Sequence, residues 1–309
     1  MEERQLRELA RIGGMDIRFD RPMRLYTTLR VGGDAAAFYR ARRVPELRRM
    51  LAFLGEEGLP YLVVGKGSNL LVLDGGYDGV VIRLGGELAS FEAEGDGEEI
   101  SAGGGAAVRA LLRSCALRGI GGLEFLTGIP GTVGGAVAMN AGSAGEEIGE
   151  KVIRLEMVDH KGRVYSASRE DLSFGYRTCS LPPGAVVTRV VLKAEHAEPE
   201  VVKRRMKELL AGRESAQPLR AASAGSVFKN PPGDFAGRLM EKAGLKGRRL
   251  GGAVISPVHA NFIINEAGAA AADILGLMEL AREEVYRRSG VWLEPEIRIV
   301  GQQVPARPA

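Results

Sequence analysis

The sequence is poor in the residues that build disulfide scaffolds and metal sites. Its 309 residues include two cysteines, Cys115 and Cys179, and three histidines. The cysteines are far apart, no CxxC occurs, and no histidine stands at a metal-ligand spacing from them. We therefore expect neither a disulfide scaffold nor a metal site. Cys115 falls on the apolar stripe of an expected helix, which favours a place in the core.

Long hydrophobic runs and a strong excess of one charge are also missing. No window holds the roughly 18 uninterrupted apolar residues of a membrane span, and the charged start lacks the apolar core of a signal peptide. Lysine plus arginine number 42 against 39 for aspartate plus glutamate. Such a small excess does not indicate a nucleic-acid surface. We expect a cytoplasmic protein without membrane insertion or a nucleic-acid partner.

Several common catalytic signatures do not occur. The chain has no GxxxxGK[ST], no GxGxxG after a strand, no HExxH and no GxSxG. The P-loop, dinucleotide-fold, zinc-protease and serine-hydrolase interpretations therefore lose most of their support.

Helical and extended patterns alternate through the chain, which is 45% hydrophobic. Apolar spacing predicts a helix before Gly58, a second over 108–117 and a third near 270–289, and short β-branched runs predict strands. A shift to charged, helix-forming residues places a domain boundary near 197. We predict an α+β protein with a first domain at 1–196, in two lobes of about 1–90 and 91–196, a second at 197–301, and a loose tail at 302–309.

Two loops are rich in glycine: "GKGSN" at 65–69, directly after an expected strand, and "GIPGTVGGAVAMNAG" at 128–142. Bare backbone lets consecutive N–H groups converge on an anion, and phosphate is the usual one. The second loop is also long and apolar, which suits a ligand with a pyrophosphate and a flat ring, such as FAD. Tight turns and close strand crossings are the alternative explanation.

Three polar clusters lie outside these loops: "SFGYRTCS", "SAGSVFKNP" and "WLEPEIRIVG". If "PEIRIV" is a strand, Glu296 and Arg298 share one face while Ile297 and Ile299 share the other. Taken singly, such polar residues are usually solvated charges, turns or caps.

Seven motifs in order make the chain similar to a known family, the UDP-N-acetylenolpyruvoylglucosamine reductases. They cover most of the chain: "YTTLRVGGDA" (26–35), "VGKGSNLL" (64–71), "GIPGTVGGAVAMNAG" (128–142), "FGYR" (174–177), "AGSVFKNP" (224–231), "HANFIIN" (259–265) and "EPEIRIVG" (294–301). The ordered series is specific, whereas each motif alone is weak.

The resemblance implies a two-lobed FAD-binding domain of the vanillyl-alcohol-oxidase (PCMH) type and a C-terminal α/β substrate-binding domain. It implies that NADPH reduces UDP-N-acetylglucosamine enolpyruvate to UDP-N-acetylmuramate, through non-covalent FAD, in peptidoglycan precursor synthesis. The residues it places at the cofactor are Gly65, Lys66, Gly67, Ser68, Asn69, Gly128, Ile129, Pro130, Gly131, Gly134, Gly135, Asn140, Ala141 and Gly142.

The resemblance also assigns catalytic roles. Ser226 would give a proton to C2 of the substrate, and Arg177 and Glu296 would stabilise the enolic carboxylate. Glu296, rather than Glu294, stands directly before the "IRI" run that marks the family glutamate. The substrate-binding positions are Tyr176, Lys229 and Asn230.

Two departures from the family pattern matter. Cys179 stands where the family often has serine, and the segment after Arg177 enters a strand too soon for the tyrosine-bearing substrate loop of one family branch. The chain thus resembles the short-loop branch, with a different substrate clamp. Another FAD-linked oxidoreductase of the same fold, or a non-catalytic flavin- or nucleotide-sugar-binding protein, remain the alternatives. Oligomeric state and the preference for NADPH over NADH stay open.

Overall fold

The computed structural model describes residues 1–94 and 97–304 and divides the chain into two compact units. The first unit comprises residues 1–19, 37–65 and 79–212, and the second comprises 20–36, 66–78 and 213–309. The chain therefore leaves the first unit twice before its C-terminal part. The last five residues of the expected tail, 305–309, lie outside the described residues.

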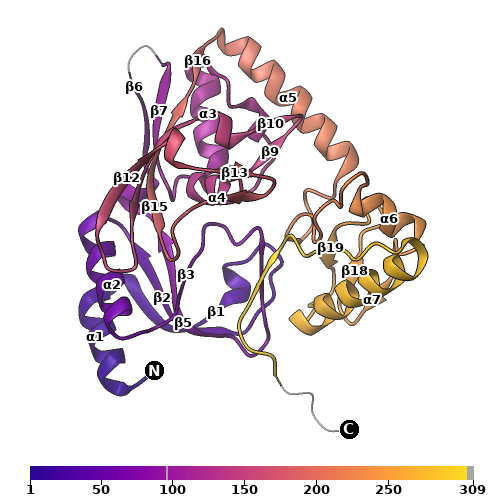
Figure 1. Ribbon diagram of the computed structural model, residues 1–309, viewed down its shortest axis with the longest axis horizontal. Coiled ribbons are helices and arrows are strands. Elements are labelled where there is room, and N and C mark those ends of the chain that lie inside the picture. Colours follow the sequence, from indigo (N-terminus) through magenta and orange to yellow (C-terminus); the bar gives the residue numbers. More distant parts are fainter. Residues whose placement is uncertain (95–96, 305–309) are drawn as a thin grey trace. The chain divides into compact units, whose positions relative to one another are not determined.

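A four-stranded sheet of order β1-β2-β5-β3 contributes most of its residues to the first unit, together with two helices (Figure 1). Apolar side chains of Leu47, Met50 and Leu54 lie on one side of the helix that follows β2 and pack with Val80 and Ile82 of β5. The elements are α1 (Glu3–Gly13), β1 (Ile17–Pro22), β2 (Asp34–Ala41), α2 (Val44–Glu56), β3 (Tyr61–Val63) and β5 (Tyr77–Leu84).

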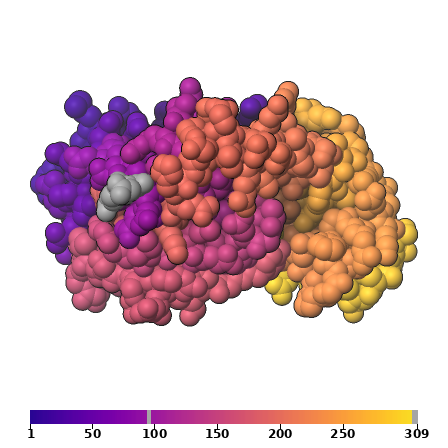
Figure 2. Space-filling model, turned by 90° about the horizontal axis from the view of Figure 1, so that it is seen from above, coloured from indigo at the N-terminus to yellow at the C-terminus, as the bar shows by residue number. Residues whose placement is uncertain are grey.

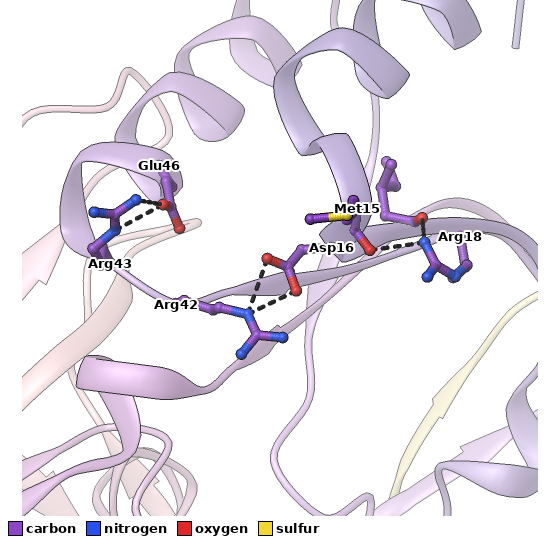
Figure 3. Close-up of polar contacts among 7 residues, drawn as sticks. Met15, Asp16, Arg18, Arg42, Arg43 and Glu46 are labelled. Carbon is purple, nitrogen blue, oxygen red and sulfur yellow. Dashed lines mark hydrogen bonds and ion pairs between the residues drawn. The ribbon is translucent and has the colours of Figure 1, made fainter.

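Ion pairs lie on the surface around β1, β2 and the start of α2. The Arg42 Nε donates to both carboxylate oxygens of Asp16, at 2.7 and 2.9 Å, and Arg43 donates to Glu46 near the start of α2 (Figure 3). The Arg18 guanidinium donates to the Met15 carbonyl at 2.8 Å. The two ion pairs lie at the surface, where water and salt screen them, so each contributes little to stability.

A five-stranded antiparallel sheet of order β12-β11-β15-β7-β6 forms the rest of the first unit. Leu111 and Leu112 pack with Leu155 and Val190 of the sheet, and Cys115 is buried among them as expected. The elements are β6 (Phe91–Glu94), β7 (Glu99–Gly103), α3 (Val108–Arg118), α4 (Val133–Ala138), β11 (Val152–Val158), β12 (Val164–Ser168) and β15 (Val186–Lys193).

Short strand pairs connect these elements. They are β8 (Ile120–Gly121) with β16 (Glu195–His196), β9 (Gly142–Ser143) with β10 (Glu146–Glu147), and β13 (Phe174–Gly175) with β14 (Thr178–Cys179). The following helix, α5 (Pro199–Ala216), buries Val202 alone of its 18 residues, and Figure 2 shows the salmon-coloured helix on the surface.

The second unit joins three separate stretches of chain around one core. Leu29 and Leu71, from the early stretches, share this core with Val227, Phe228 and Ile297. Its elements are β4 (Leu70–Val72), α6 (Ala236–Lys242), β17 (Arg249–Leu250), β18 (Ala253–Ile255), β19 (Ile263–Asn265), α7 (Ala271–Ser289) and β20 (Arg298–Val300). Strand β20 pairs in parallel with β4, and β17, β18 and β19 form an antiparallel sheet.

One expectation about the last strand is wrong. Strand β20 begins at Arg298, so Glu296 lies before it, and Ile297 is buried while Ile299 is 38% exposed. Glu296 and Ile297 are thus not part of the strand whose alternation was expected to place them on opposite faces. The alternation fails because the segment bends at Ile297 before it pairs with β4.

Candidate active site

The two glycine-rich loops meet within the first unit at Gly65. A Cβ atom added to Gly65 would lie 2.5 Å from the Oγ1 of Thr132, so a larger residue there requires Thr132 to shift. Thr132 in turn accepts a hydrogen bond from the Gly135 N–H at 3.4 Å and caps α4. The strand expected before the first loop is present at Tyr61–Val63, and Gly65 abuts the second loop.

Part of the glycine content of the second loop serves a close backbone crossing. The Gly134 N–H donates to the Gly104 carbonyl, and the Val133 N–H donates to the Ala106 carbonyl, both at 2.9 Å. A Cβ atom on Gly134 would lie 2.9 Å from that Gly104 oxygen. The alternative explanation of the glycines is thus correct for this position, without excluding a ligand at the others.

Part of the second loop is accessible, whereas Ala141, which was assigned to the cofactor, is 6% exposed. Residues 128–131 and 134–135 are partly or fully exposed, while Thr127 and Thr132 on their flanks are buried. The Oγ1 of Thr127 is buried and has no hydrogen-bond partner among the described residues. A buried hydroxyl without a partner costs about 1–3 kcal/mol, which a bound ligand can offset.

Asn140 has a different environment from the loop glycines. It is buried, it adopts a left-handed backbone with φ of 41°, and its side-chain amide is hydrogen-bonded within the protein. Its Nδ2 donates to Glu147 at 2.5 Å and to the Gly175 carbonyl at 3.1 Å, and its Oδ1 accepts from the Gly149 N–H at 3.0 Å. The Asn140 backbone N–H also donates within the protein, to the Val137 carbonyl at 3.0 Å, so the described contacts of Asn140 serve the fold and its assignment to the cofactor stays a prediction.

Arg177 lies in the tight turn of the β13–β14 hairpin that Asn140 holds. Its φ is 59°, a conformation that costs a non-glycine residue about 1–2 kcal/mol. Its guanidinium lies 5.5 Å from the ring centroid of Tyr176, which is 49% exposed. Strain of this kind persists where the surroundings impose it and is typical of functional sites.

The second unit places Ser226 and Glu296 on neighbouring segments. The Glu296 N–H donates to the Val227 carbonyl at 2.8 Å, and Phe228 forms a bridge with Pro295. On the other side of the same segment, Ser226 forms a bridge with Phe262. The segment that carries Ser226 is thus held between two others, one of which carries Glu296.

Asn69 of the first glycine-rich loop contacts the Glu296 segment. Its Nδ2 donates to the Glu296 carbonyl at 3.2 Å, and its own carbonyl accepts from the Arg298 N–H at 3.0 Å. Lys66, Gly67 and Ser68 share this unit, and the Gly67 carbonyl accepts from the Thr28 N–H at 3.2 Å. Within the second unit, the loop assigned to the cofactor thus lies against the backbone of the assigned catalytic glutamate.

Of the three assigned substrate positions, Lys229 and Asn230 belong to the second unit and Tyr176 belongs to the first. Lys229 forms an ion pair with Glu294 at 3.5 Å, and the Oδ1 of Asn230 accepts from the Ala236 N–H at 3.0 Å, at the start of α6. Tyr176 belongs, with Arg177, to the first unit. The ion-pair partner of Lys229 is thus Glu294, the other glutamate of the "EPEIRIVG" motif, and not the assigned catalytic Glu296.

Comparison with known proteins decides the family. Residues 35–168 match an FAD-binding domain, and residues 217–300 match the C-terminal domain of UDP-N-acetylenolpyruvoylglucosamine reductase. Over 94% of the chain the sequence is 46% identical to the UDP-N-acetylenolpyruvoylglucosamine reductase of Alkalilimnicola ehrlichii, of which 97% is covered. The chain belongs to this reductase family.

Other members agree with this placement. The reductase of Rubrobacter xylanophilus is 44% identical over 92% of the chain and 95% of its own length. A crystal structure of the Thermus caldophilus reductase superposes with a TM-score of 0.81 at 42% identity, covering 92% of this chain and 99% of that one. The expected α+β fold, with an FAD-binding domain and the C-terminal domain of this reductase family, is confirmed, as are the enzyme class and the FAD cofactor.

The glycine-rich loops fit FAD on the observations above. The matched FAD-binding domain includes both loops, and the accessible residues 128–131 adjoin the buried Thr127 hydroxyl that has no hydrogen-bond partner among the described residues. Among residues 1–94 and 97–304, no cluster of three or more His, Cys, Asp or Glu side chains could hold a metal ion. In that same part of the chain no helix is long and apolar enough to cross a bilayer.

Two side chains near the site are held in their neutral forms. Burial raises the pKa of the Cys179 thiol, which keeps it protonated where the family often has a hydroxyl. Burial, and then the nearby Lys246, lowers the pKa of His259, whose Nδ1 accepts from the Asn261 N–H at 3.2 Å. The hydrogen bond places the proton of the neutral ring on Nε2.

Sequence reasoning missed Asn261, inside the "HANFIIN" motif. Its side chain is 2% exposed and forms two hydrogen bonds with Phe228. An asparagine within an apolar, strand-like run was the available signal, because a buried amide must find partners in the protein.

Proposed function

We propose that this enzyme reduces UDP-N-acetylglucosamine enolpyruvate to UDP-N-acetylmuramate with NADPH, in the cytoplasm, as a step of peptidoglycan precursor synthesis. The observation that supports it best is the placement of Ser226 and Glu296 on backbone-paired segments, joined by the 2.8 Å hydrogen bond from Glu296 to Val227. Reduction of an enol ether needs a proton donor and a group that stabilises the adjacent carboxylate, and these two side chains supply both.

FAD, when bound, would accept a hydride from NADPH and deliver it to C3 of the enolpyruvyl group. The residues proposed to hold it are those of the two loops, with the backbone N–H groups of 65–69, Gly128 and Gly131 as candidates to bind its pyrophosphate. The buried Thr127 hydroxyl is available to it as a further hydrogen-bonding group.

The assigned side chains would stabilise the negative charge that develops on the substrate after hydride transfer. A hydride at C3 leaves negative charge at C2 and on the adjacent carboxylate of the substrate. Arg177, a permanent cation, and a protonated Glu296 would stabilise this carboxylate, the first by charge and the second by a hydrogen bond. Ser226 would then give its proton to C2, completing the reduced lactyl ether.

An anaerobic titration tests the proposed function. NADPH should bleach the yellow enzyme, and UDP-N-acetylglucosamine enolpyruvate should then restore the colour as the reduced flavin is reoxidised. Bleaching without recovery would reject the substrate and favour another FAD-linked oxidoreductase. A protein that binds both compounds without a colour change would be a non-catalytic binder.

Replacement of Ser226 separates the two half-reactions. Ser226→Ala should leave flavin reduction by NADPH nearly intact and slow reoxidation by the substrate about 10²- to 10⁴-fold, the scale of losing a general acid. Stopped-flow absorbance of the flavin measures both rates. The control is Ser289→Ala, which removes a hydroxyl at the end of α7 that donates to the Val285 carbonyl at 2.7 Å. Equal losses in both half-reactions of Ser226→Ala would contradict its assigned role.

A further inference from the structure

Asn261 binds the segment that carries Ser226 through both its side chain and its backbone. The Phe228 N–H donates to the Asn261 Oδ1 at 3.0 Å, and the Asn261 Nδ2 donates to the Phe228 carbonyl at 2.8 Å. The Asn261 carbonyl accepts from the Val227 N–H at 2.9 Å. One residue thus satisfies both polar groups of Phe228 and the N–H of Val227.

Burial makes these bonds selective for asparagine. The side chain of Asn261 is 2% exposed and Phe228 is fully buried, so neither can turn to water for its hydrogen bonds. An unpaired buried amide or peptide group costs about 1–3 kcal/mol. A side-chain amide offers one donor and one acceptor side by side, which matches the N–H and carbonyl of a single residue.

The contacts of Val227 extend this anchoring to the second assigned catalytic side chain. Val227 donates to Asn261 on one side, and on the other its carbonyl accepts from the Glu296 N–H at 2.8 Å. A displacement of the Val227–Phe228 backbone would therefore move Ser226, which precedes it, and would loosen Glu296, which depends on it. The Asn69 amide donates to the Glu296 carbonyl. This bond would not restore the position of the segment that carries Ser226.

We propose that Asn261 is a positioning residue for the reductase reaction, which fixes the backbone of Val227 and Phe228 and thereby the separation of the Ser226 hydroxyl from the Glu296 carboxyl. The inference rests on the proposed roles of these two residues. Asn261 itself acts through the Phe228 peptide groups, so its loss should affect the step that uses Ser226 and Glu296 and spare the step that does not.

The test compares the two half-reactions in the FAD-loaded, full-length enzyme. Asn261→Leu keeps a similar volume and removes both side-chain hydrogen bonds. Reoxidation by UDP-N-acetylglucosamine enolpyruvate should slow about 100-fold, the scale of a 1 Å misplacement, while flavin reduction by NADPH should stay within about threefold. The matched control is Asp273→Ala, which removes two side-chain bonds to backbone N–H groups, of Gly252 and Ala270, in the same unit. It should lower the thermal midpoint and leave both rates unchanged.

A second variant keeps the experiment decisive if Asn261→Leu does not fold. Asn261→Asp can reproduce both bonds to Phe228 only while its carboxyl is protonated, and burial raises the pKa of such a group. Its reoxidation rate, relative to wild type at each pH, should therefore be highest at low pH and fall as the pH rises. His259 titrates beside it, with Lys246 and Glu241 as its charged neighbours, which is why the ratio to wild type is read.

The outcomes separate the inference from the proposed function. A wild-type enzyme that bleaches with NADPH but is not reoxidised by the substrate would overturn the proposed function and this inference with it. A wild type that turns over, with Asn261→Leu reoxidised at the wild-type rate or slowed equally in both half-reactions, would overturn the inference alone.

Discussion

Individual residues in this enzyme carry conformations that their chemistry alone would not favour. Arg177 occupies the left-handed region, which a two-residue hairpin turn normally assigns to glycine or asparagine. The hairpin is held by Asn140 and by Arg169, whose Nε donates to the Gly149 carbonyl at 2.8 Å and whose guanidinium lies 4.8 Å from the Phe174 ring centroid. The neighbours thus offset the strain, and the turn presents an arginine where a glycine would be easier.

The two glutamates near the C-terminus allow a test at this scale. Glu296→Ala should slow reoxidation by the substrate about 10²- to 10³-fold, as expected when one donor to developing charge is lost. Glu296→Gln should lose less, because its amide N–H still donates a hydrogen bond. Glu294→Gln, which weakens the exposed ion pair with Lys229, should change the rate by less than either. If Glu294→Gln is the most damaging of the three in stopped-flow assays, the assignment of Glu296 is wrong.

The glycine-rich loops combine two functions in one element. Gly134 allows the second loop to cross the 104–108 segment, and Gly65 allows the first loop to approach Thr132, while residues 128–131 remain accessible. A loop that serves as a structural crossing and as a ligand cradle tolerates few side chains. The helix interior of α5 is the opposite case, since a Cβ atom on Gly212 would meet nothing within 4 Å.

This contrast gives a pair of predictions for alanine substitution. Gly65→Ala should displace Thr132, destabilise the protein by about 1–3 kcal/mol and reduce FAD retention, because the Thr132 side chain caps the N-terminus of α4. Gly212→Ala should stabilise it by up to about 1 kcal/mol, because alanine is the better helix former. Urea unfolding and the flavin absorbance of the purified variants measure both effects. A Gly65→Ala enzyme with wild-type stability and full FAD content would show that the close contact is relieved without cost.

At the scale of the whole molecule, the second unit depends on residues far apart in the chain. Strand β4 pairs with β20, and the Asp74 carboxylate accepts from the Ala271 and Ala272 N–H groups at the start of α7, both at 2.9 Å. Leu29 and Leu71 complete the same core. A negative charge at a helix N-terminus contributes about 0.3–1 kcal/mol, and the core residues contribute more.

The prediction for a fragment follows from this arrangement. Residues 197–309 expressed alone should not form a stable native fold, because they lack β4, Asp74, Leu29 and Leu71. Circular dichroism and amide hydrogen exchange should show lower helix content and little protection. A fragment with cooperative unfolding and protected β18 and β19 amides would instead support a self-sufficient domain with the boundary predicted near 197.

The sequence by itself determined what depends on neighbouring residues and on ordered motifs. Apolar periodicity located α2, α3 and α7, short β-branched runs located β3 and β5, and the seven motifs identified the family. Periodicity is a local property, and helices and strands obey it because their hydrogen bonds and side-chain directions repeat over a few residues.

Only the tertiary structure decided which distant groups meet. Asn69 contacts Glu296, Asn261 contacts Phe228, and Asp74 contacts the start of α7. The residues in these contacts are 227, 33 and 197 positions apart in the sequence, respectively. No local pattern encodes such partners, because a side-chain amide or carboxylate can bond any backbone group brought within about 3 Å. The spacing of polar residues likewise could not show that the chain bends at Ile297 before it pairs with β4, where Ile297 is buried and Ile299 is 38% exposed.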